Sequence, residues 1–403
     1  MSEAFIYDGI RTAFGRHGGV LAALRTDELL AGPIRELISR NGFDGAQVED
    51  VVAGDTNQAG EDSRNVARTA VLLAGLPASV AGITLNRLCG SGAAAVVDAA
   101  RAIKCEEGEL IIAAGVESMS RAPWVVSKAG SAYARTQVME DSTIGWRFPN
   151  KRLLNEFGAD TMPETADNIG RDLHISREES DAYAWTSQQR YAAARADGFF
   201  REEIMPVEVP AARRKDPAHI VDEDEHPRPD TSLEKLAALR PLYAGGVVTA
   251  GNASGINDGA GALLLGNAGM EKKLGLNPRA RILAGAVAGV DPRVMGLGPV
   301  AASRKALQRS GLSLGDMDVI ELNEAFATQV LGCLKQLDIP VDDARVNPNG
   351  GAIAVGHPLG ASGIRLVLTA MRQLERIEGR YALVTLCIGV GQGIALVLER
   401  MQG

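Results

Sequence analysis

Helix and strand patterns recur in the same order at two places in the chain. Residues 27–54 predict an amphipathic helix, a stop at Gly42 and then a short apolar strand. Residues 298–322 repeat this plan, with Gly311 as the stop. Such a repeat predicts two structural units of one design, so the chain should fold as two related halves.

A second pair of segments supports the duplication. The segments 91–114 and 362–386 each begin at a turn of small residues, continue as a helix that Gly108 or Gly379 ends, and finish in an apolar strand. These strands show no alternation of apolar and polar residues, which is typical of parallel sheets covered by helices on both faces. We therefore predict an α/β protein built from parallel sheets.

The segment 122–253 interrupts the first half. It is richer in charge and proline than its surroundings, most clearly at 211–230. Segments of this composition lie on the surface and often carry binding residues. We expect this insert to form loops and helices that cover a site.

Composition and charge narrow the possible functions. The 403 residues carry a formal net charge of −8, which disfavours a nucleic-acid partner because sequence-independent binding needs a basic surface. The four cysteines make no disulfide framework in a chain of this length, and none has zinc-site spacing. The N-terminal residues form no secretory leader, and no apolar run reaches membrane length. We expect a cytoplasmic protein without membrane spans or a bound metal.

Three glycine-rich segments carry candidate chemistry. Cys89 lies in NRLCGSG, ahead of a helix whose N-terminus favours a thiolate. His357 lies in GGAIAVGHPLGASG, and Cys387 begins CIGVGQG. Each residue alone is equally compatible with a packing role. The repeat places all three at corresponding strand ends, where α/β proteins bind ligands, so they predict one cleft with glycines on its floor.

Seven ordered segments resemble the hallmark segments of the thiolase family, and the resemblance covers essentially the whole chain. They are NRLCGSG (86–92), GVESMSRAP (115–123), MPETADN (162–168), AGNASGINDGA (250–260), NEAFA (323–327), GGAIAVGHPLGASG (350–363) and CIGVGQG (387–393). Within the family, GWRF at 145–148, SRAPWV at 120–125 and CIGVGQG resemble members that act on 3-oxoadipyl-CoA. The resemblance implies thiolytic cleavage of that substrate into succinyl-CoA and acetyl-CoA, as in the beta-ketoadipate route of aromatic breakdown.

The resemblance implies catalytic roles for five residues. Cys89 is expected to be the nucleophile that carries the acyl group, His357 to activate it, and Cys387 to exchange a proton with the acetyl carbon. Asn323 is expected to hold a water of one oxyanion hole, and the N–H groups of Cys89 and Gly389 to form another. No permanently bound cofactor is implied, because coenzyme A is a substrate.

Binding residues are implied as well. The expected coenzyme A contacts are Arg228 near the adenine, Ala250 and Ser254 along the pantetheine, Met162, Ala325 and Phe326 in the tunnel, and Tyr243, where Phe is frequent. A terminal carboxylate in a tunnel needs a cation to offset its desolvation, which nominates Arg147 or Arg87. A surface or subunit-contact role for these two arginines stays open.

The implied fold is duplicated, with two βαβαβαββ halves in a five-layered αβαβα core. The N-terminal half would comprise 1–121 and 254–276, the inserted loop domain 122–253, and the C-terminal half 277–403. A homotetramer, a dimer of dimers with the insert at the tetramer contact, is implied too.

Other functions stay open at this point. An acetoacetyl-CoA thiolase or a broad 3-oxoacyl-CoA thiolase would share the catalytic residues. A non-catalytic acyl-CoA or lipid carrier of thiolase-like fold would not need two thiols and an imidazole together. The glycines at 389–393 lack the following helix of a dinucleotide site, and a ketoacyl synthase should carry histidine where Cys387 stands. Cys105 and Cys333 lie in apolar helical patterns and are predicted to be core residues.

Overall fold

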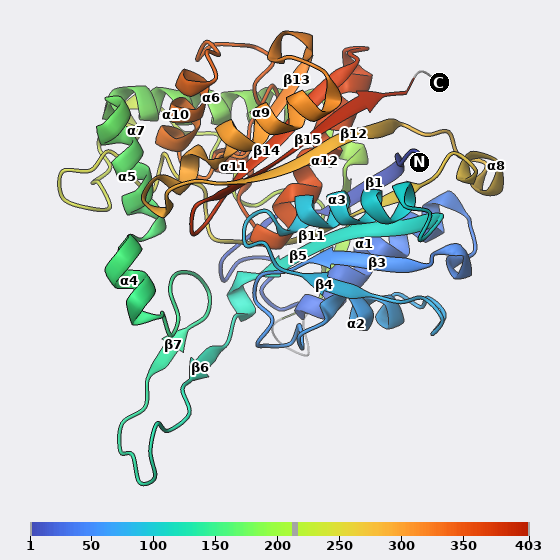
Figure 1. Cartoon of the computed structure of the whole chain (residues 1–403), viewed down its shortest axis with the longest axis horizontal. Coiled ribbons are helices and arrows are strands. Elements are labelled where there is room, and N and C mark those ends of the chain that lie inside the picture. Colours follow the sequence, from blue (N-terminus) through green and yellow to red (C-terminus); the bar gives the residue numbers. More distant parts are fainter. Residues whose placement is uncertain (1, 212–216, 402–403) are drawn as a thin grey trace.

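The computed structural model describes residues 2–211 and 217–401 and shows two packed α/β halves (Figure 1). The N-terminal half consists of β1 (Phe5–Thr12), α1 (Thr26–Asn41), β3 (Asp50–Gly54), α2 (Val66–Leu73), β4 (Ile83–Leu85), α3 (Ser91–Lys104), β5 (Leu110–Ser118) and β11 (Asn257–Gly266). The C-terminal half consists of β12 (Ala280–Gly289), α9 (Gly298–Ser310), β13 (Val319–Leu322), α10 (Ala327–Gln336), α12 (Leu359–Arg376), β14 (Tyr381–Ile388) and β15 (Gln392–Arg400). The predicted βαβαβαββ order is confirmed, although in the second half a single bridge between Ile320 and Val346 replaces the third strand.

The strands of both halves join in one sheet, in the order β13-β14-β15-β12-β1-β11-β5-β3-β4. Within the halves, β3 pairs in parallel with β4 and β5, and β13 with β14, whereas the β1–β11, β11–β5, β12–β15 and β14–β15 pairs are antiparallel. The predicted parallel pairing is confirmed for the strands that indicated it, β3, β5, β13 and β14, but antiparallel pairs with β11 and β15 make the sheet mixed rather than parallel. The unbroken apolar runs reflect burial on both faces, which a mixed sheet between helices shares.

Helices form three layers around the two half-sheets. The helices α3 and α12 contact each other and lie between the half-sheets. On the outer faces, α1 and α2 cover the N-terminal half-sheet, and α9 and α10 cover the C-terminal one. Each interface between layers holds a cluster of buried aliphatic side chains. This arrangement confirms the five-layered αβαβα core.

Glycines set the close approach of the two central helices. A Cβ atom on Gly92 of α3 would lie 2.5 Å from the Gly360 carbonyl oxygen, and one on Gly363 of α12 would lie 2.0 Å from the Ala93 nitrogen. Neither position tolerates a side chain without separating the helices. These glycines were expected to admit a ligand, but they serve packing instead. Their effect is to bring the N-terminal ends of α3 and α12 together.

Two of the four predicted helix stops are confirmed. Gly42 and Gly311 cap α1 and α9 in the left-handed conformation that glycine favours. Gly108 and Gly379 have ordinary backbone angles, and the left-handed residues after α3 and α12 are Glu106 and Glu378. The prediction was wrong there because the chain takes the turn before it reaches the glycine.

The insert supplies an arm and a helical cover. The strands β6 (Trp124–Val126) and β7 (Met139–Asp141) form an arm that extends far from the body (Figure 1). The helices α5 (Met162–Leu173) and α6 (Arg177–Ala196) pack against α10. The remaining short elements are β2 (Gly15–Arg16), α4 (Lys151–Phe157), β8 (Ile204–Met205), β9 (Val207–Val209), β10 (His219–Val221), α7 (Leu233–Ala237), α8 (Met270–Leu274) and α11 (Ala352–Val355). None of the helices in the described ranges combines the length and apolar character needed to cross a membrane.

Candidate active site

Cys89 lies in a constrained turn between β4 and α3. The preceding Leu88 has a φ of 47°, a left-handed conformation that a branched side chain rarely adopts. The Ser91 hydroxyl holds this turn by accepting the Arg87 N–H at 2.9 Å and donating to the Leu88 carbonyl oxygen at 2.6 Å. The turn therefore fixes the direction of the Cys89 side chain ahead of the helix.

His357 lies in the loop before α12, and its hydrogen bonds define its tautomer. Its backbone N–H donates to Asn257 Oδ1 at 2.9 Å. The ring Nδ1 lies 2.6 Å from Ser362 Oγ, whose own proton is donated to the Pro358 carbonyl oxygen at 2.8 Å. Because the hydroxyl has one proton, it must accept from Nδ1–H. Nε2 therefore carries the lone pair of the ring and is its basic atom.

Asn323 follows the end of β13 and faces this basic nitrogen. Its Nδ2 lies 3.3 Å from His357 Nε2. Its Oδ1 is buried and has no hydrogen-bond partner among the described residues. A buried amide oxygen of this kind is a natural acceptor for an ordered water. This geometry supports the expected role of Asn323 in holding a water.

Cys387 and Gly389 complete the group of predicted catalytic residues. Cys387 ends β14 and is 1% exposed. Burial raises its pKa, and the nearby thiols of Cys89 and Cys333 raise it further. Gly389 lies in the turn between β14 and β15. Its backbone N–H forms a hydrogen bond with the Cys89 thiol that lowers the pKa of this thiol. The two thiols and this N–H therefore lie in one place.

The thiol and the imidazole are both neutral in the resting protein. Burial raises the pKa of Cys89 to about 11, partly offset by the N–H groups of Gly389 and Cys89. Burial and the nearby Arg365 lower the pKa of His357 to about 3. The expectation that the helix N-terminus holds Cys89 as a thiolate is therefore wrong, because desolvation outweighs the helix dipole.

Several expected tunnel residues lie next to Cys387. Ala325, Phe326 and Cys387 belong to one small apolar cluster, against which Met162 packs. The Ser254 N–H donates to the Ala325 carbonyl oxygen at 2.9 Å. An apolar wall with few polar groups is typical of small-molecule sites.

Other expected binding residues are not tied to this cluster. Tyr243 donates to or accepts from Thr161 Oγ1 at 2.8 Å at the start of α5. Arg228 and Ala250 are exposed, and the Arg228 backbone N–H binds the Gln188 side chain at 3.0 Å. No hydrogen bond among the described residues joins Arg228 or Ala250 to Cys89.

The two arginines nominated for a carboxylate differ in setting. Arg147 is half-buried in the irregular chain between β7 and α4 and makes no hydrogen bond or ion pair within the described part of the protein. Arg87 precedes the nucleophile turn, and its Nη1 is 3.5 Å from Gln392 Oε1. The Arg87 Nε is buried without a partner among the described atoms.

The two remaining cysteines, Cys333 and Cys105, differ in burial. Cys333 is buried in α10, which confirms the prediction of a core residue. Cys105 is exposed, so the prediction for it is wrong, because α3 ends at Lys104 and Cys105 follows as its cap. Across residues 2–211 and 217–401, no group of three or more His, Cys, Asp and Glu is arranged to hold a metal ion.

Sequence reasoning missed Glu117, which lies behind the nucleophile. This buried carboxylate ends β5 and accepts the N–H groups of Asn57 at 3.2 Å and Gly360 at 3.0 Å. It thereby connects the loop after β3 with the start of α12. Ser362 and Asn257, which hold His357, were missed too. All three lie inside the quoted segments, so position in a motif was the available signal.

Comparisons with known proteins identify the family of the chain. Residues 4–269 match the family model "Thiolase, N-terminal domain" and residues 276–400 match "Thiolase, C-terminal domain". A 3-oxoadipyl-CoA/3-oxo-5,6-dehydrosuberyl-CoA thiolase of Escherichia coli K12 is 59% identical over 100% of both chains, and a beta-ketoadipyl-CoA thiolase of Pseudomonas aeruginosa is 57% identical over 99% of each. The crystal structure of the Bacillus anthracis acetyl-CoA acetyltransferase matches with a TM-score of 0.92 and 36% identity, covering 100% of this chain and 99% of that one. The chain belongs to the thiolase family, and it is an acyltransferase with coenzyme A as a substrate.

Proposed function

We propose that the protein cleaves 3-oxoadipyl-CoA with coenzyme A into succinyl-CoA and acetyl-CoA through an acyl group on Cys89. The single observation that supports the chemistry is the unprotonated Nε2 of His357, held beside Asn323. The nearby thiols of Cys89 and Cys387 would supply the nucleophile and the acid. The substrate choice is supported by the relatives, because those named for this substrate are 59% and 57% identical. An acetyl-CoA acetyltransferase of Pseudomonas aeruginosa is 45% identical, and the one of Bacillus anthracis is 36% identical.

In the first half-reaction, Cys89 attacks the 3-oxo carbon of the substrate. The thiol proton passes to His357 Nε2 as the sulfur–carbon bond forms, and the oxyanion is stabilised by N–H donors or by the water on Asn323. The bond between C2 and C3 then breaks, and its electron pair leaves with the acetyl-CoA carbon. Cys387 donates its proton to that carbon and is left as a thiolate. The products of this step are acetyl-CoA and a succinyl thioester on Cys89.

In the second half-reaction, coenzyme A releases the acyl group. The Cys387 thiolate removes the thiol proton of coenzyme A, whose sulfur attacks the thioester. Cys89 leaves as a sulfur anion and regains its proton from His357. Succinyl-CoA departs, and both thiols and the imidazole return to their neutral resting forms. The two steps replace one difficult cleavage, which is the advantage of a covalent intermediate.

The insert and the binding residues belong to the same proposal. Coenzyme A would lie under the insert 122–253, between Arg228 at its adenine end and the apolar wall at Phe326. Tyr243, Ala250 and Ser254 would line the route. This insert would form a unit between an N-terminal half of 1–121 and 254–276 and a C-terminal half of 277–403. The free thiols of all four cysteines support a reducing, cytoplasmic location.

Substrate preference tests the function directly. The wild-type protein is expected to cleave 3-oxoadipyl-CoA with a kcat/KM at least about tenfold above that for acetoacetyl-CoA, since an extra buried ion pair is worth about 1.4 kcal/mol or more. Loss of the absorbance of the magnesium enolate follows both reactions. Equal or reversed preference would favour an acetoacetyl-CoA or broad thiolase, and no cleavage of either would favour a carrier.

The two nominated arginines give a prediction on the origin of that preference. Arg87→Ala or Arg147→Ala is expected to lower kcat/KM for 3-oxoadipyl-CoA about tenfold or more, because the terminal carboxylate loses its cation. Activity on acetoacetyl-CoA should change little, since that substrate has no carboxylate. The ratio of the two kcat/KM values is the measurement. An unchanged ratio in both variants would show that neither arginine reads the carboxylate.

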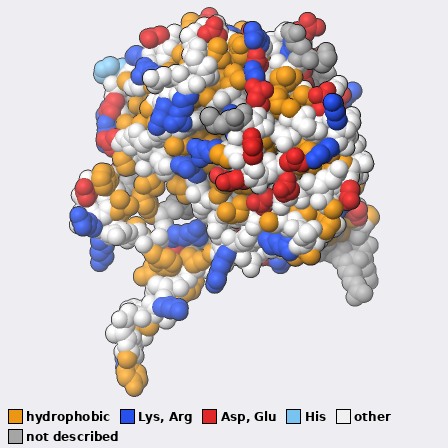
Figure 2. Space-filling model, turned by 45° about the vertical axis from the view of Figure 1, so that its right-hand side comes forward, with side chains coloured by type: hydrophobic (Ala, Val, Ile, Leu, Met, Phe, Trp, Pro, Cys, Tyr) orange, Lys and Arg blue, Asp and Glu red, His pale blue; other side chains and the backbone are white. Residues whose placement is uncertain are grey.

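The projecting arm supports an assembly of four chains. Its exposed hydrophobic side chains include Trp124, 64% exposed, and Tyr133, 99% exposed, and they gather on the arm in Figure 2. A large apolar surface of this kind generally marks a protein contact. We assign the arm to the tetramer contact of a dimer of dimers.

Removing apolar area from the arm should weaken that tetramer. The variant Trp124→Ser/Met139→Ser is expected to raise the tetramer dissociation constant about 10²- to 10⁴-fold, because two large side chains that each contribute about 1.5–3 kcal/mol when buried are lost together. Sedimentation equilibrium measures this constant. Ile377→Ser, which alters an exposed apolar residue outside the arm, is the control and should change nothing. A wild-type monomer, or an unaffected tetramer in the double variant, would contradict the assignment.

A further inference from the structure

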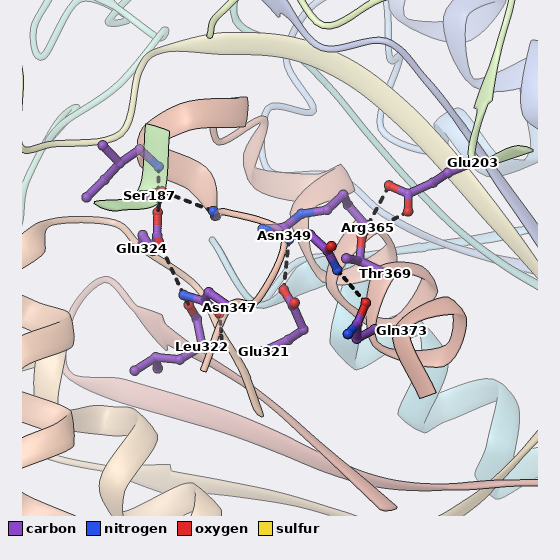
Figure 3. A network of polar contacts seen from close by, with 12 residues as sticks. Ser187, Glu203, Glu321, Leu322, Glu324, Asn347, Asn349, Arg365, Thr369 and Gln373 are labelled. Carbon is purple, nitrogen blue, oxygen red and sulfur yellow. Dashed lines mark hydrogen bonds and ion pairs between the residues drawn. The ribbon is translucent and has the colours of Figure 1, made fainter. Parts of the chain in front are cut away.

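A buried ion pair lies behind His357. Arg365 of α12 points toward Glu321 of β13 (Figure 3), and its Nη1 donates to Glu321 Oε2 at 3.0 Å. Arg365 is 2% exposed and Glu321 is 0% exposed. The Arg365 Nε and Nη2 and the Glu321 Oε1 have no partner among the described residues. A buried pair that leaves three polar atoms unsatisfied is a poor source of stability, so its place in the fold calls for another reason.

The pair joins the two elements that hold the two ring nitrogens of His357. Arg365 is three residues beyond Ser362, whose hydroxyl holds Nδ1 at 2.6 Å. Glu321 is two residues before Asn323, whose amide faces Nε2 at 3.3 Å. Residues three apart on a helix lie close together, and β13 runs directly into Asn323. A change in the Arg365–Glu321 contact would therefore move one ring partner relative to the other.

The neighbouring acids already have other partners. Glu203, ahead of β8, accepts from Arg11 at 2.6 Å and from Thr369 at 3.1 Å. Glu324, after β13, accepts from Ser187 at 2.6 Å and from Asn347 at 3.0 Å (Figure 3). Burial raises the pKa of Glu321, and the two neighbouring carboxylates raise it further, whereas the positive charge of Arg365 opposes them by favouring the charged form. Arg365 is thus the cation that Glu321 requires at neutral pH.

Arg365 also acts on His357 through its charge. After burial, the positive charge of Arg365 is the second cause that lowers the pKa of His357. A cation near an imidazole disfavours the imidazolium and keeps Nε2 free to accept a proton. The same side chain therefore affects both the position and the protonation of the base.

We propose that Arg365 and Glu321 are positioning residues that fix α12 against β13 and so hold His357 between Ser362 and Asn323 as a neutral base. Neither side chain touches the substrate, and both act through His357. This inference rests on the proposed role of His357 in thiolysis.

The test compares Arg365→Met, Arg365→Lys and Glu321→Gln with the control Arg372→Met, which alters a partly exposed arginine of the same helix. Arg365→Met is expected to lower kcat up to about 10²-fold, the cost of misplacing a catalytic group from a distance, while KM for coenzyme A stays within about twofold. Arg365→Lys keeps the charge and should recover part of kcat. Arg372→Met should behave as the wild type.

The pH profile separates positioning from simple damage. Loss of the Arg365 charge raises the pKa of His357, so the acid limb of kcat/KM for Arg365→Met should move to higher pH. Glu321→Gln leaves the positive charge of Arg365 in place. The acid limb of this variant should therefore stay or move to lower pH, although its kcat falls. If Arg365→Met does not fold, Arg365→Lys and Glu321→Gln still carry the comparison. Thermal melting followed by circular dichroism shows which variants are folded.

Three results would overturn the inference. Folded Arg365 and Glu321 variants with wild-type kcat and pH profile would overturn it alone, leaving the proposed function intact. A lower kcat together with a higher KM, and no change in the acid limb of the pH profile, would assign the pair a merely structural role. A His357→Ala protein as active as the wild type in the same assay would overturn both the inference and the proposed function.

Discussion

A Cys89→Ala protein is expected to fold as the wild type does and to lose thiolysis almost completely. Removal of a nucleophile that acts with a paired base lowers kcat by about 10⁴- to 10⁶-fold in comparable enzymes. The Cys89 side chain is small, so its truncation should change stability by about 1 kcal/mol or less. Initial rates of 3-oxoadipyl-CoA cleavage and thermal melting measure the two effects.

The matched control for this variant is Cys105→Ala. Cys105 is an exposed thiol that follows α3, at the opposite end of the helix from Cys89. Its removal should leave the rate unchanged. If Cys89→Ala keeps more than about a hundredth of the wild-type rate, another group must carry the acyl chain and the proposed mechanism is wrong.

Replacement of His357 by alanine should have the second largest effect. The expected fall in kcat is about 10²- to 10⁴-fold, the usual contribution of a positioned acid–base group. The thiol pKa of about 11 makes this base necessary, because the fraction of free thiolate at neutral pH is small. Binding of coenzyme A should change little, since Nε2 faces the reacting atoms. Steady-state kinetics with both substrates varied separate kcat from KM.

His174→Asn provides the control for the histidine variant. His174 is exposed and has a φ of 54°, a conformation that asparagine tolerates well. This change should preserve folding and rate. A His357→Ala rate within about tenfold of the wild type would mean that the sulfur loses its proton to a different acceptor.

The fold was largely predictable because the duplication appears directly in the residue pattern. The helices that end at Gly42 and Gly311 occur where their apolar spacing and glycines predict them. Strand direction was predicted correctly for β3, β5, β13 and β14. The antiparallel partners β11 and β15 were not foreseen, because burial on both faces gives the same apolar run in parallel and antiparallel strands. The local pattern also hid the roles of Gly92 and Gly363, which depend on a helix contact between distant segments.

Candidate residues for the site could be named from the sequence, but their electrostatics could not be predicted. Cys89, His357 and Cys387 stand in recognisable motifs. The helix N-terminus before Cys89 suggested a thiolate, yet the pKa of the thiol depends on how deeply the packed halves bury it. The contribution of Arg365 to His357 was equally hidden, since it arises from the packing of α12 against β13.

Isolation of the acyl-enzyme tests the central claim most directly. The protein is mixed with 3-oxoadipyl-CoA without free coenzyme A, quenched in acid, digested and analysed by mass spectrometry. We expect one equivalent of acetyl-CoA in solution and a succinyl group on the peptide that contains Cys89, lost again when coenzyme A is added before the quench. A succinyl group on any other residue, or acetyl-CoA release with Cys89 unmodified, would contradict the account.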